Sequence, residues 1–167
     1  MICQIGSVRE EELVAMQAFP IVGHVREDDL PWVWVDKVGL QVLRVSVETG
    51  VWVVRNRFKP GARVQTHRHT GVVHGFTMSG CWKYAEYSVE YTAGTFIYEP
   101  AGSVHTLTVP ESNEDITDVV FVMEGANLNL AEDLTTVESV TDGPSTLAAY
   151  LKLCEMQGFS QPTGILA

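Results

Sequence analysis

Short hydrophobic segments alternate with turn signals along the middle of this chain. Segments rich in Val, Thr, Tyr, Phe and Trp are separated by Gly- and Pro-containing turns, for example at 49–50, 59–61 and 100–102. Because β-branched and aromatic residues favour strands and such turns connect them, the pattern is typical of an all-β sandwich or barrel. With 167 residues, the chain has the length of one domain.

Alternation within the expected strands indicates which side chains share a face. Successive strand residues point to opposite faces, so positions i and i+2 point the same way. In 51–58, Arg55 and Arg57 need water, which turns the alternate residues inward, and Arg44 and Lys83 orient their own strands in the same way. The residues expected to face inward, or to share one face of their strand, are Leu43, Val45, Val47, Trp52, Val54, Asn56, Phe58, His74, Phe76, Met78, Trp82, Tyr84, Glu86, His105, Leu107 and Val109.

The C-terminal segment has a different period. Leu147, Leu151 and Cys154 recur at helical spacing, with Tyr150 beside them, and we expect one helix over 145–157. Its apolar stripe is expected to pack on the barrel or on a partner subunit.

The N-terminal segment is irregular, with a short strand expected at 32–35. The apolar run 30–34 would be awkward if exposed, so we expect it to pack on a second subunit or across its own barrel. The expected organisation is an N-terminal arm over 1–38, a barrel over 39–140, and a C-terminal helix and tail over 141–167.

Four of the five histidines fall between positions 67 and 105. His67 and His69 are two residues apart and project from the same strand face, and His105 follows a rigid turn that can bring its strand beside them. Three imidazoles can hold one metal ion at about 2.0–2.2 Å from nitrogen. The alternative interpretation of an isolated His-x-His is a surface pair on a half-exposed strand.

The glycines and the proline around these histidines complete two motifs. They read Gly61-x5-His67-x-His69-x4-His74-x5-Gly80 and then Gly94-x5-Pro100-x-Gly102-x2-His105. Together they resemble the paired motifs of the cupin superfamily. This resemblance implies a double-stranded β-helix, or jelly roll, that holds a metal inside through His67, His69 and His105.

Two departures from the cupin pattern leave the fourth ligand open. His74 stands where the motif usually has a glutamate, and Val109 stands where it usually has an asparagine. Glu86, expected to point inward from the next strand, can replace the missing carboxylate, because a buried carboxylate needs a partner such as a cation. His74 is the other candidate, either as a ligand or hydrogen-bonded to a neighbour.

The runs HRHTGVVHGF and YEPAGSVHT, with DDLPWV upstream, resemble a cupin subgroup that includes 2,4'-dihydroxyacetophenone dioxygenase. The resemblance implies a non-haem iron enzyme that uses dioxygen to cleave a carbon–carbon bond in a small hydroxyketone or diketone. One divalent transition metal is expected, Fe(II) first, with Zn, Ni or Mn as alternatives, since imidazole suits all of them. His74 and Tyr84 are expected to act as acid or base, in a pocket walled by Trp52, Asn56, Phe58, Phe76, Met78 and Trp82.

Two other functions fit the same motifs. One is a zinc or manganese cupin that acts as an isomerase or hydrolase and needs no dioxygen. The other is a non-catalytic sensor or binding module, in which four protein ligands would close the metal site.

Charge narrows the range of partners. The formal net charge is −10, from 11 basic and 21 acidic residues. Nucleic acid and anionic membrane are poor partners for such a chain, because phosphate neutralisation needs clustered Lys and Arg. The N-terminus lacks a basic flank followed by an apolar run, and the three cysteines form no paired framework, so a cytoplasmic protein is expected. Sheet edges in a jelly roll need protection, and we expect a homo-oligomer, a dimer or tetramer.

Overall fold

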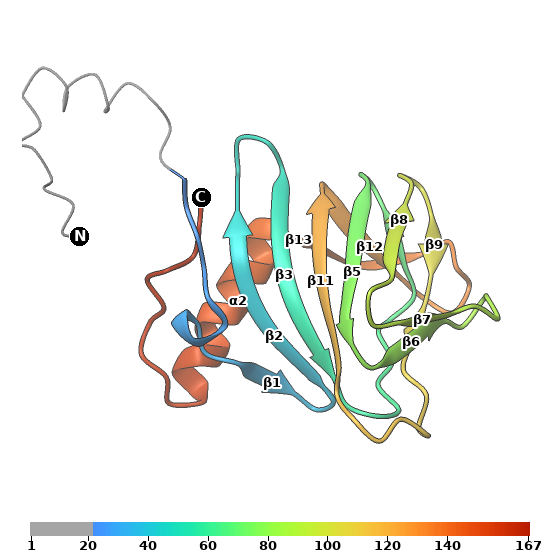
Figure 1. The fold of residues 1–167 in the computed structure, drawn as a ribbon. Coiled ribbons are helices and arrows are strands. Elements are labelled where there is room, and N and C mark those ends of the chain that lie inside the picture. Colours follow the sequence, from blue (N-terminus) through green and yellow to red (C-terminus); the bar gives the residue numbers. More distant parts are fainter. Residues whose placement is uncertain (1–21) are drawn as a thin grey trace, which may run out of the picture.

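The computed structural model describes residues 22–167. Its β-strands form three hydrogen-bonded sheets that wrap around one core, with one α-helix near the C-terminus (Figure 1). The elements are a short 3-10 helix η1 (Glu27–Asp29), β1 (Val33–Val35), β2 (Val38–Val45), β3 (Val51–Phe58), β4 (His67–His69), β5 (Val73–Ser79), β6 (Cys81–Tyr84), β7 (Glu90–Thr92), β8 (Phe96–Glu99), β9 (Val104–His105), β10 (Leu107–Thr108), β11 (Thr117–Glu124), β12 (Ala126–Leu130), β13 (Val137–Asp142) and α2 (Gly143–Met156).

The largest sheet has six strands in the order β1-β2-β3-β11-β5-β8. A four-stranded sheet, β13-β12-β4-β9, and a three-stranded sheet, β10-β6-β7, complete the wall around the core. All pairings between these strands are antiparallel, and β11 joins strands far apart in sequence by pairing with both β3 and β5. The all-β prediction is therefore confirmed.

The core lies on the inner faces of these sheets. The alternation predicted for 51–58 is confirmed, because Trp52, Val54 and Phe58 are buried. Their cross-strand partners in β11 lie on the same face, and Met123 pairs with Trp52 in the register. His105, Leu107 and Val109 are also buried, as their shared parity predicts.

The inward assignment in β2 is partly wrong. Val45 is buried, but Val47 is 78% exposed because β2 ends at Val45. A bulge between Val42 and Arg44 inserts Leu43, which leaves Val42 rather than Leu43 in the core. A bulge adds one residue to a strand and so shifts its alternation, which a strict period of two does not anticipate.

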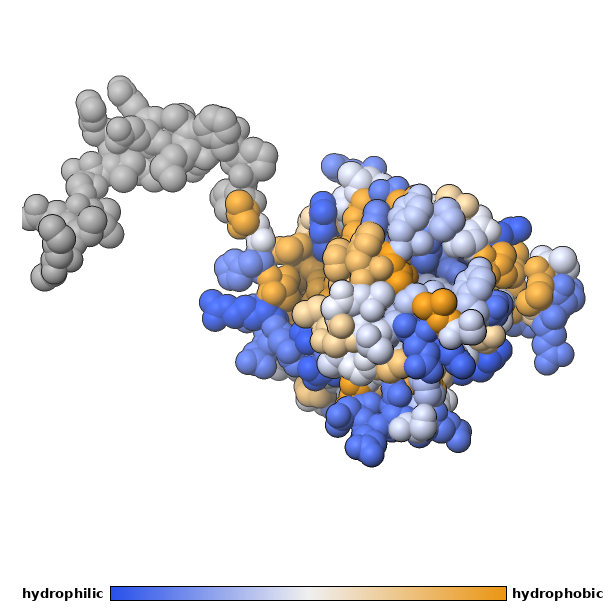
Figure 2. All heavy atoms as spheres, turned by 45° about the vertical axis from the view of Figure 1, so that its right-hand side comes forward, coloured by the Kyte–Doolittle hydropathy of each residue, from blue (hydrophilic) through white to orange (hydrophobic). Residues whose placement is uncertain are grey.

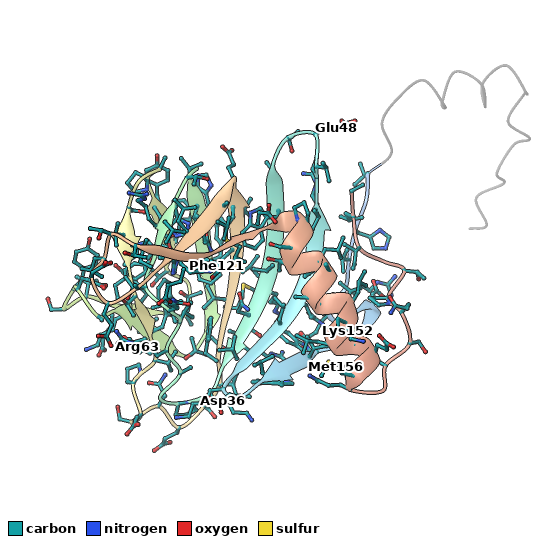
Figure 3. All side chains as sticks on the ribbon, turned by 180° about the vertical axis from the view of Figure 1, so that it is seen from behind. Asp36, Glu48, Arg63, Phe121, Lys152 and Met156 are labelled. Atoms are coloured by element: carbon teal, nitrogen blue, oxygen red, sulfur yellow. The ribbon has the colours of Figure 1, made fainter. Side chains whose placement is uncertain are left out.

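Helix α2 lies across β2 and β3 on the inner side of the large sheet (Figure 3). It begins at Gly143, where a side chain would come within 3.0 Å of Trp52 and Val45, so the helix can approach the sheet closely. Asp142 caps its first turn by accepting a hydrogen bond from the Ser145 amide. The predicted helix is confirmed, with Tyr150 and Cys154 at the centre of its buried face and Leu147 and Leu151 partly buried beside them.

The arm packs across its own barrel. Val33 and Leu30 are buried, and β1 pairs with β2. The Tyr150 hydroxyl donates a hydrogen bond to the Pro31 carbonyl at 2.7 Å, which ties the arm to α2. This is one of the two packing arrangements that the apolar run 30–34 predicts, and a second subunit stays a prediction, as does the division at residues 38 and 140.

In the described part of the chain, no helix is both long and apolar enough to cross a membrane. The prediction drawn from the N-terminal residues, which lack a basic flank followed by an apolar run, concerns residues outside the described range.

Candidate metal centre

Three imidazole rings converge because of how two short strands pair. His67 and His69 share one face of β4, and β9 pairs with β4 so that His105 lies directly opposite His67. All three side chains are buried. One ligand atom from each ring lies within 4.8 Å of the others, as the His-x-His spacing and the position of His105 predict.

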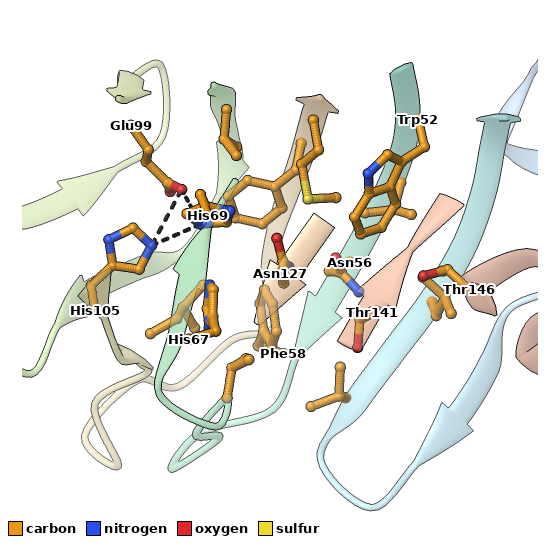
Figure 4. A pocket seen from close by; sticks show the side chains of 18 of the residues that line it. Trp52, Asn56, Phe58, His67, His69, Glu99, His105, Asn127, Thr141 and Thr146 are labelled. Atoms are coloured by element: carbon orange, nitrogen blue, oxygen red, sulfur yellow. Dashed lines mark hydrogen bonds and ion pairs between the residues drawn. The ribbon is translucent and has the colours of Figure 1, made fainter. Parts of the chain in front are cut away.

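The closest ring nitrogens have the separation that a shared cation requires. Nε2 of His69 and Nε2 of His105 are 3.0 Å apart. Two nitrogens at about 2.1 Å from one ion, in neighbouring coordination positions, lie roughly 3 Å apart. Figure 4 shows the His69 and His105 rings turned toward one another at one end of a cavity, with His67 beside them.

His67 has one ring nitrogen, Nε2, available to bind a metal. Its Nδ1 is 2.7 Å from the Gln65 carbonyl and donates to it, since a carbonyl only accepts, which leaves the Nε2 lone pair free. Burial lowers the pKa of His67 to about 4. The ring is therefore neutral at physiological pH, which is the form that binds a metal.

A carboxylate completes the cluster, and it is Glu99 rather than Glu86. Glu99 is buried, and its Oε2 lies 2.7 Å from Nε2 of His69 and 3.3 Å from Nε2 of His105. Burial acts to raise the pKa of Glu99, but the adjacent imidazole rings of His105 and His69 outweigh burial and hold that pKa well below its usual range. The Glu99 carboxyl is therefore ionised, and we call His67, His69, His105 and Glu99 the histidine cluster.

The inward orientation expected for Glu86 is wrong. Strand β6 ends at Tyr84, so the alternation that would turn Glu86 inward stops two residues earlier. Glu86 is exposed and accepts a hydrogen bond from the Thr106 amide at 3.0 Å. A signal for Glu99 was present in the sequence, because Ile97 and Glu99 alternate with Phe96 and Tyr98 just before the turn at 100–102.

Tyr84 supports the histidine cluster from the side. Its ring stacks on His105 with 4.2 Å between ring centroids, and its hydroxyl donates a hydrogen bond to Oε1 of Glu99. Burial, reinforced by the charge of Glu99, raises the Tyr84 pKa far above its usual value. Tyr84 thus stays protonated and holds the carboxylate in place, and its expected role as an acid or base stays a prediction.

The unpaired atoms of the cluster test whether a cation fits. Oε2 of Glu99 lies close to Nε2 of His69 and Nε2 of His105 but forms no hydrogen bond of good geometry with the described residues. A buried anionic oxygen without a partner is costly, and a cation beside two imidazole nitrogens removes that cost. The residues present fit a divalent transition metal held by His67, His69 and His105, with Glu99 as the adjacent carboxylate.

A cavity of about 200 Å³ opens beside the histidine cluster. Apolar side chains form most of its wall, and among the described residues that line it none is Lys or Arg. The lining residues are Val38, Leu40, Trp52, Val54, Asn56, Phe58, Val64, His67, His69, Val73, Tyr84, Glu99, His105, Leu107, Phe121, Met123, Asn127, Thr141 and Thr146.

Three of the expected pocket residues are confirmed as cavity lining, namely Trp52, Asn56 and Phe58. Trp82 is fully buried, and its Nε1 donates to Thr77 Oγ1, but it does not line the cavity. Asn127, Thr141 and Thr146 line the cavity and were not anticipated, since they belong to β12, β13 and α2, whose position sequence motifs do not reveal.

His74, Phe76 and Met78 share one face of β5, as predicted, but that face is the outer one. Phe76 is 45% exposed and Met78 is 56% exposed, and His74 stacks against Phe96 on the surface. The expected roles of His74 as an acid or base and of Phe76 and Met78 as pocket walls are therefore wrong. Figure 2 shows apolar patches among hydrophilic side chains on the face that it presents.

Comparison with known proteins places this architecture in a family. Residues 22–126 match the model of the ChrR cupin-like domain. The chain belongs to this cupin family. The match covers more than half of the chain and includes all four members of the histidine cluster.

Solved cupin structures are similar over most of the chain. A protein of unknown function with a cupin-like fold from Ralstonia eutropha has 34% identity and a TM-score of 0.73, over 78% of this chain and 80% of its own. An RmlC-like cupin from the same organism has 21% identity and a TM-score of 0.79, over 90% and 97%. An acetylacetone dioxygenase from Acinetobacter johnsonii has 15% identity and a TM-score of 0.68, over 81% and 93%. The last two show the fold alone, and no curated protein sequence matches the chain.

Proposed function

We propose that this cupin is a metal-dependent dioxygenase that cleaves a carbon–carbon bond in a small hydroxyketone or diketone. The observation that carries the proposal is a set of three imidazoles and one carboxylate at the wall of an apolar cavity. An imidazole and carboxylate set with open positions suits ferrous iron among the first-row metals. When bound, such a metal supplies Lewis acidity and a site for dioxygen.

Charge balance favours a substrate that binds as a monoanion. A divalent cation beside the Glu99 carboxylate leaves one unit of positive charge in an apolar cavity. An enolate with two adjacent oxygens neutralises that charge. A low-dielectric site favours a summed charge of zero over the metal, the carboxylate and the substrate. Because no Lys or Arg lines the cavity among the described residues, the rest of the substrate is expected to be uncharged.

The remaining residues position and shield the reacting groups. Tyr84 fixes Glu99 and stacks on His105, so the ligand geometry is set before any substrate arrives. Trp52, Phe58 and Phe121 supply apolar wall that excludes water from the substrate. The cavity volume suits a molecule little larger than benzene, which fits within about 150 Å³.

The test is dioxygen uptake by the iron-loaded protein with a series of α-hydroxyketones and β-diketones. We expect uptake in step with substrate loss, absent in His105→Ala and retained in His74→Ala, because His105 belongs to the cluster and His74 lies on the outer face. Zinc- and manganese-loaded protein serve as metal controls. No uptake across both substrate classes, or anaerobic turnover with zinc or manganese, would reject the dioxygenase in favour of a different cupin activity.

A further inference from the structure

Thr146 has a buried hydroxyl that no part of the described chain satisfies. The residue is 8% exposed, and its Oγ1 lacks a hydrogen-bond partner. A threonine inside a helix usually donates its hydroxyl to the carbonyl four residues earlier. Here the hydroxyl oxygen points toward the cavity from the first turn of α2, on the side opposite the histidine cluster (Figure 4).

Asn127 presents a second unpaired polar group to the same space. It lies directly opposite His69 in the pairing of β12 with β4, so its side chain shares the inner face with the histidines. Its amide forms no hydrogen bond with the rest of residues 22–167, although it lines the cavity. Figure 4 places Asn127 between the histidine cluster and Thr146.

Other polar side chains that line the cavity do have hydrogen-bond partners within the protein, and Thr141 is one of them. Its Oγ1 accepts a hydrogen bond from Asn129 Nδ2 at 2.9 Å, and it lines the same cavity. Asn56 also uses its amide, since Nδ2 donates to the Gly39 carbonyl at 3.1 Å. Thr146 and Asn127 are therefore set apart from their polar neighbours by the lack of a protein partner.

We propose that Thr146 and Asn127 form a substrate subsite that hydrogen-bonds a neutral hydroxyl or carbonyl oxygen remote from the chelating oxygens. The proposal rests on the proposed function, because it takes the chelating end of the substrate to lie at the histidine cluster. A hydroxyl and an amide, with no cation nearby, match an uncharged oxygen rather than a carboxylate or phosphate. The substrate thus has oxygens at both ends and an apolar middle along Val54 and Phe58.

Binding of a matched ligand pair tests the subsite. The probes are a seven-carbon β-diketone and the same diketone with a hydroxyl on the terminal carbon of its longer arm. Titration of zinc-loaded protein, followed by tryptophan fluorescence, gives both dissociation constants without turnover. We expect the hydroxylated diketone to bind roughly 5-fold more tightly, as one net hydrogen bond provides. In Thr146→Val that preference disappears while the plain diketone binds as before.

Stability of the ligand-free protein provides an independent readout. Valine keeps the shape of threonine and removes the unpaired hydroxyl, so Thr146→Val is expected to raise the melting temperature. The control Thr141→Val loses the hydrogen bond from Asn129 and is expected to lower it, with the ligand preference retained. A merely structural Thr146 hydroxyl would show the opposite sign, with Thr146→Val less stable than the parent.

The outcomes separate the two proposals. Equal affinity for both diketones in the parent protein, or a preference that survives Thr146→Val, overturns the subsite and leaves the proposed function standing. Failure of either diketone to bind, with zinc content verified, overturns the proposed substrate class and the subsite with it.

Discussion

Two polar clusters, one partly exposed and one buried, lie on opposite faces of the six-stranded sheet and differ in how completely their members are paired. On the outer face, Asp118 accepts hydrogen bonds from Arg55 at 2.8 and 2.9 Å and from Arg57 at 2.9 Å. Both arginines also pair with Glu27 from the arm, and we call these four residues the outer ion-pair cluster. On the inner side, Oε2 of Glu99 in the histidine cluster lies close to two imidazole nitrogens but forms no hydrogen bond of good geometry among the described residues.

The difference separates a structural role from a functional one. The outer ion-pair cluster balances two guanidinium groups against two carboxylates and fastens the arm to β3 and β11. Its groups have partners within the protein, so nothing further needs to bind. The histidine cluster is incomplete without a ligand, and incomplete pairing at a cavity wall is typical of a binding site.

The largest effect is expected from Asp118→Ala. Removing this carboxylate leaves Arg55 and Arg57 with only the exposed Glu27, and breaking a buried ion pair from one side costs about 3–4 kcal/mol. Chemical denaturation should show that loss in the free energy of unfolding. Metal content should stay at the parent level, since Asp118 lies on the other face, and a loss of metal would mean that the clusters are coupled.

Acid should weaken the metal-free protein in two separate steps. Because burial lowers the His67 pKa from 6.5 to about 4, the unfolded chain takes up a proton first, and stability falls as the pH drops from about 6.5 to 4. The loss from this group is about 3 kcal/mol. Arg57 lowers the pKa of Glu27, and His105 and His69 lower that of Glu99, so the contributions of both carboxylates are present above about 4.5 and are lost below it.

Unfolding free energies measured at intervals from pH 7 to 3 check both steps. The variant His67→Leu should flatten the upper step and leave the lower one. An unchanged upper step in this variant would show that another group titrates there.

A smaller effect on affinity is expected from Glu99→Gln. Glutamine keeps an oxygen to accept the Tyr84 hydrogen bond but removes the charge, and we expect metal affinity to fall roughly 10- to 100-fold. The metal-free protein should also lose stability, because the low pKa of Glu99 means that His69 and His105 stabilise its charged form in the folded state. Competition with a metal chelator measures the affinity, and the exposed Glu86→Gln serves as the control. Equal affinities for both variants would remove Glu99 from the site.

A charged residue in a strand shows which of its faces points outward, so alternation predicts the buried face there. Arg55 and Arg57 fixed the outer face of β3, so Trp52 and Phe58 were assigned inward correctly. Alternation failed in β5, where apolar residues occupy both faces and no charge marks either. Gly75 faces the interior there, and a side chain at this position would lie 2.6 Å from Ile97. The large apolar side chain on this part of the inner face therefore comes from Ile97 of the neighbouring strand and not from β5.

The fourth member of the histidine cluster shows a second limit. Alternation from Lys83 could not reach Glu86, because β6 ends at Tyr84 and only hydrogen bonding decides where a strand ends. Glu99 carried its own parity signal, but its nearness to His69 depends on the turn after β8, where Gly102 and Ser103 hydrogen-bond to the His69 backbone in β4. Such a contact between two sheets has no trace in local sequence.

The sequence alone determined the all-β architecture, the helix near the C-terminus and three of the four members of the histidine cluster. These follow from local periodicity and from spacing, because residues two apart on a strand always share a face. Only the tertiary structure decided which face of β5 is buried, that Glu99 supplies the carboxylate, and that Thr146 and Asn127 complete the cavity. Those features depend on which strands and helices pack together, and the energy of such packing is shared among residues far apart in the chain.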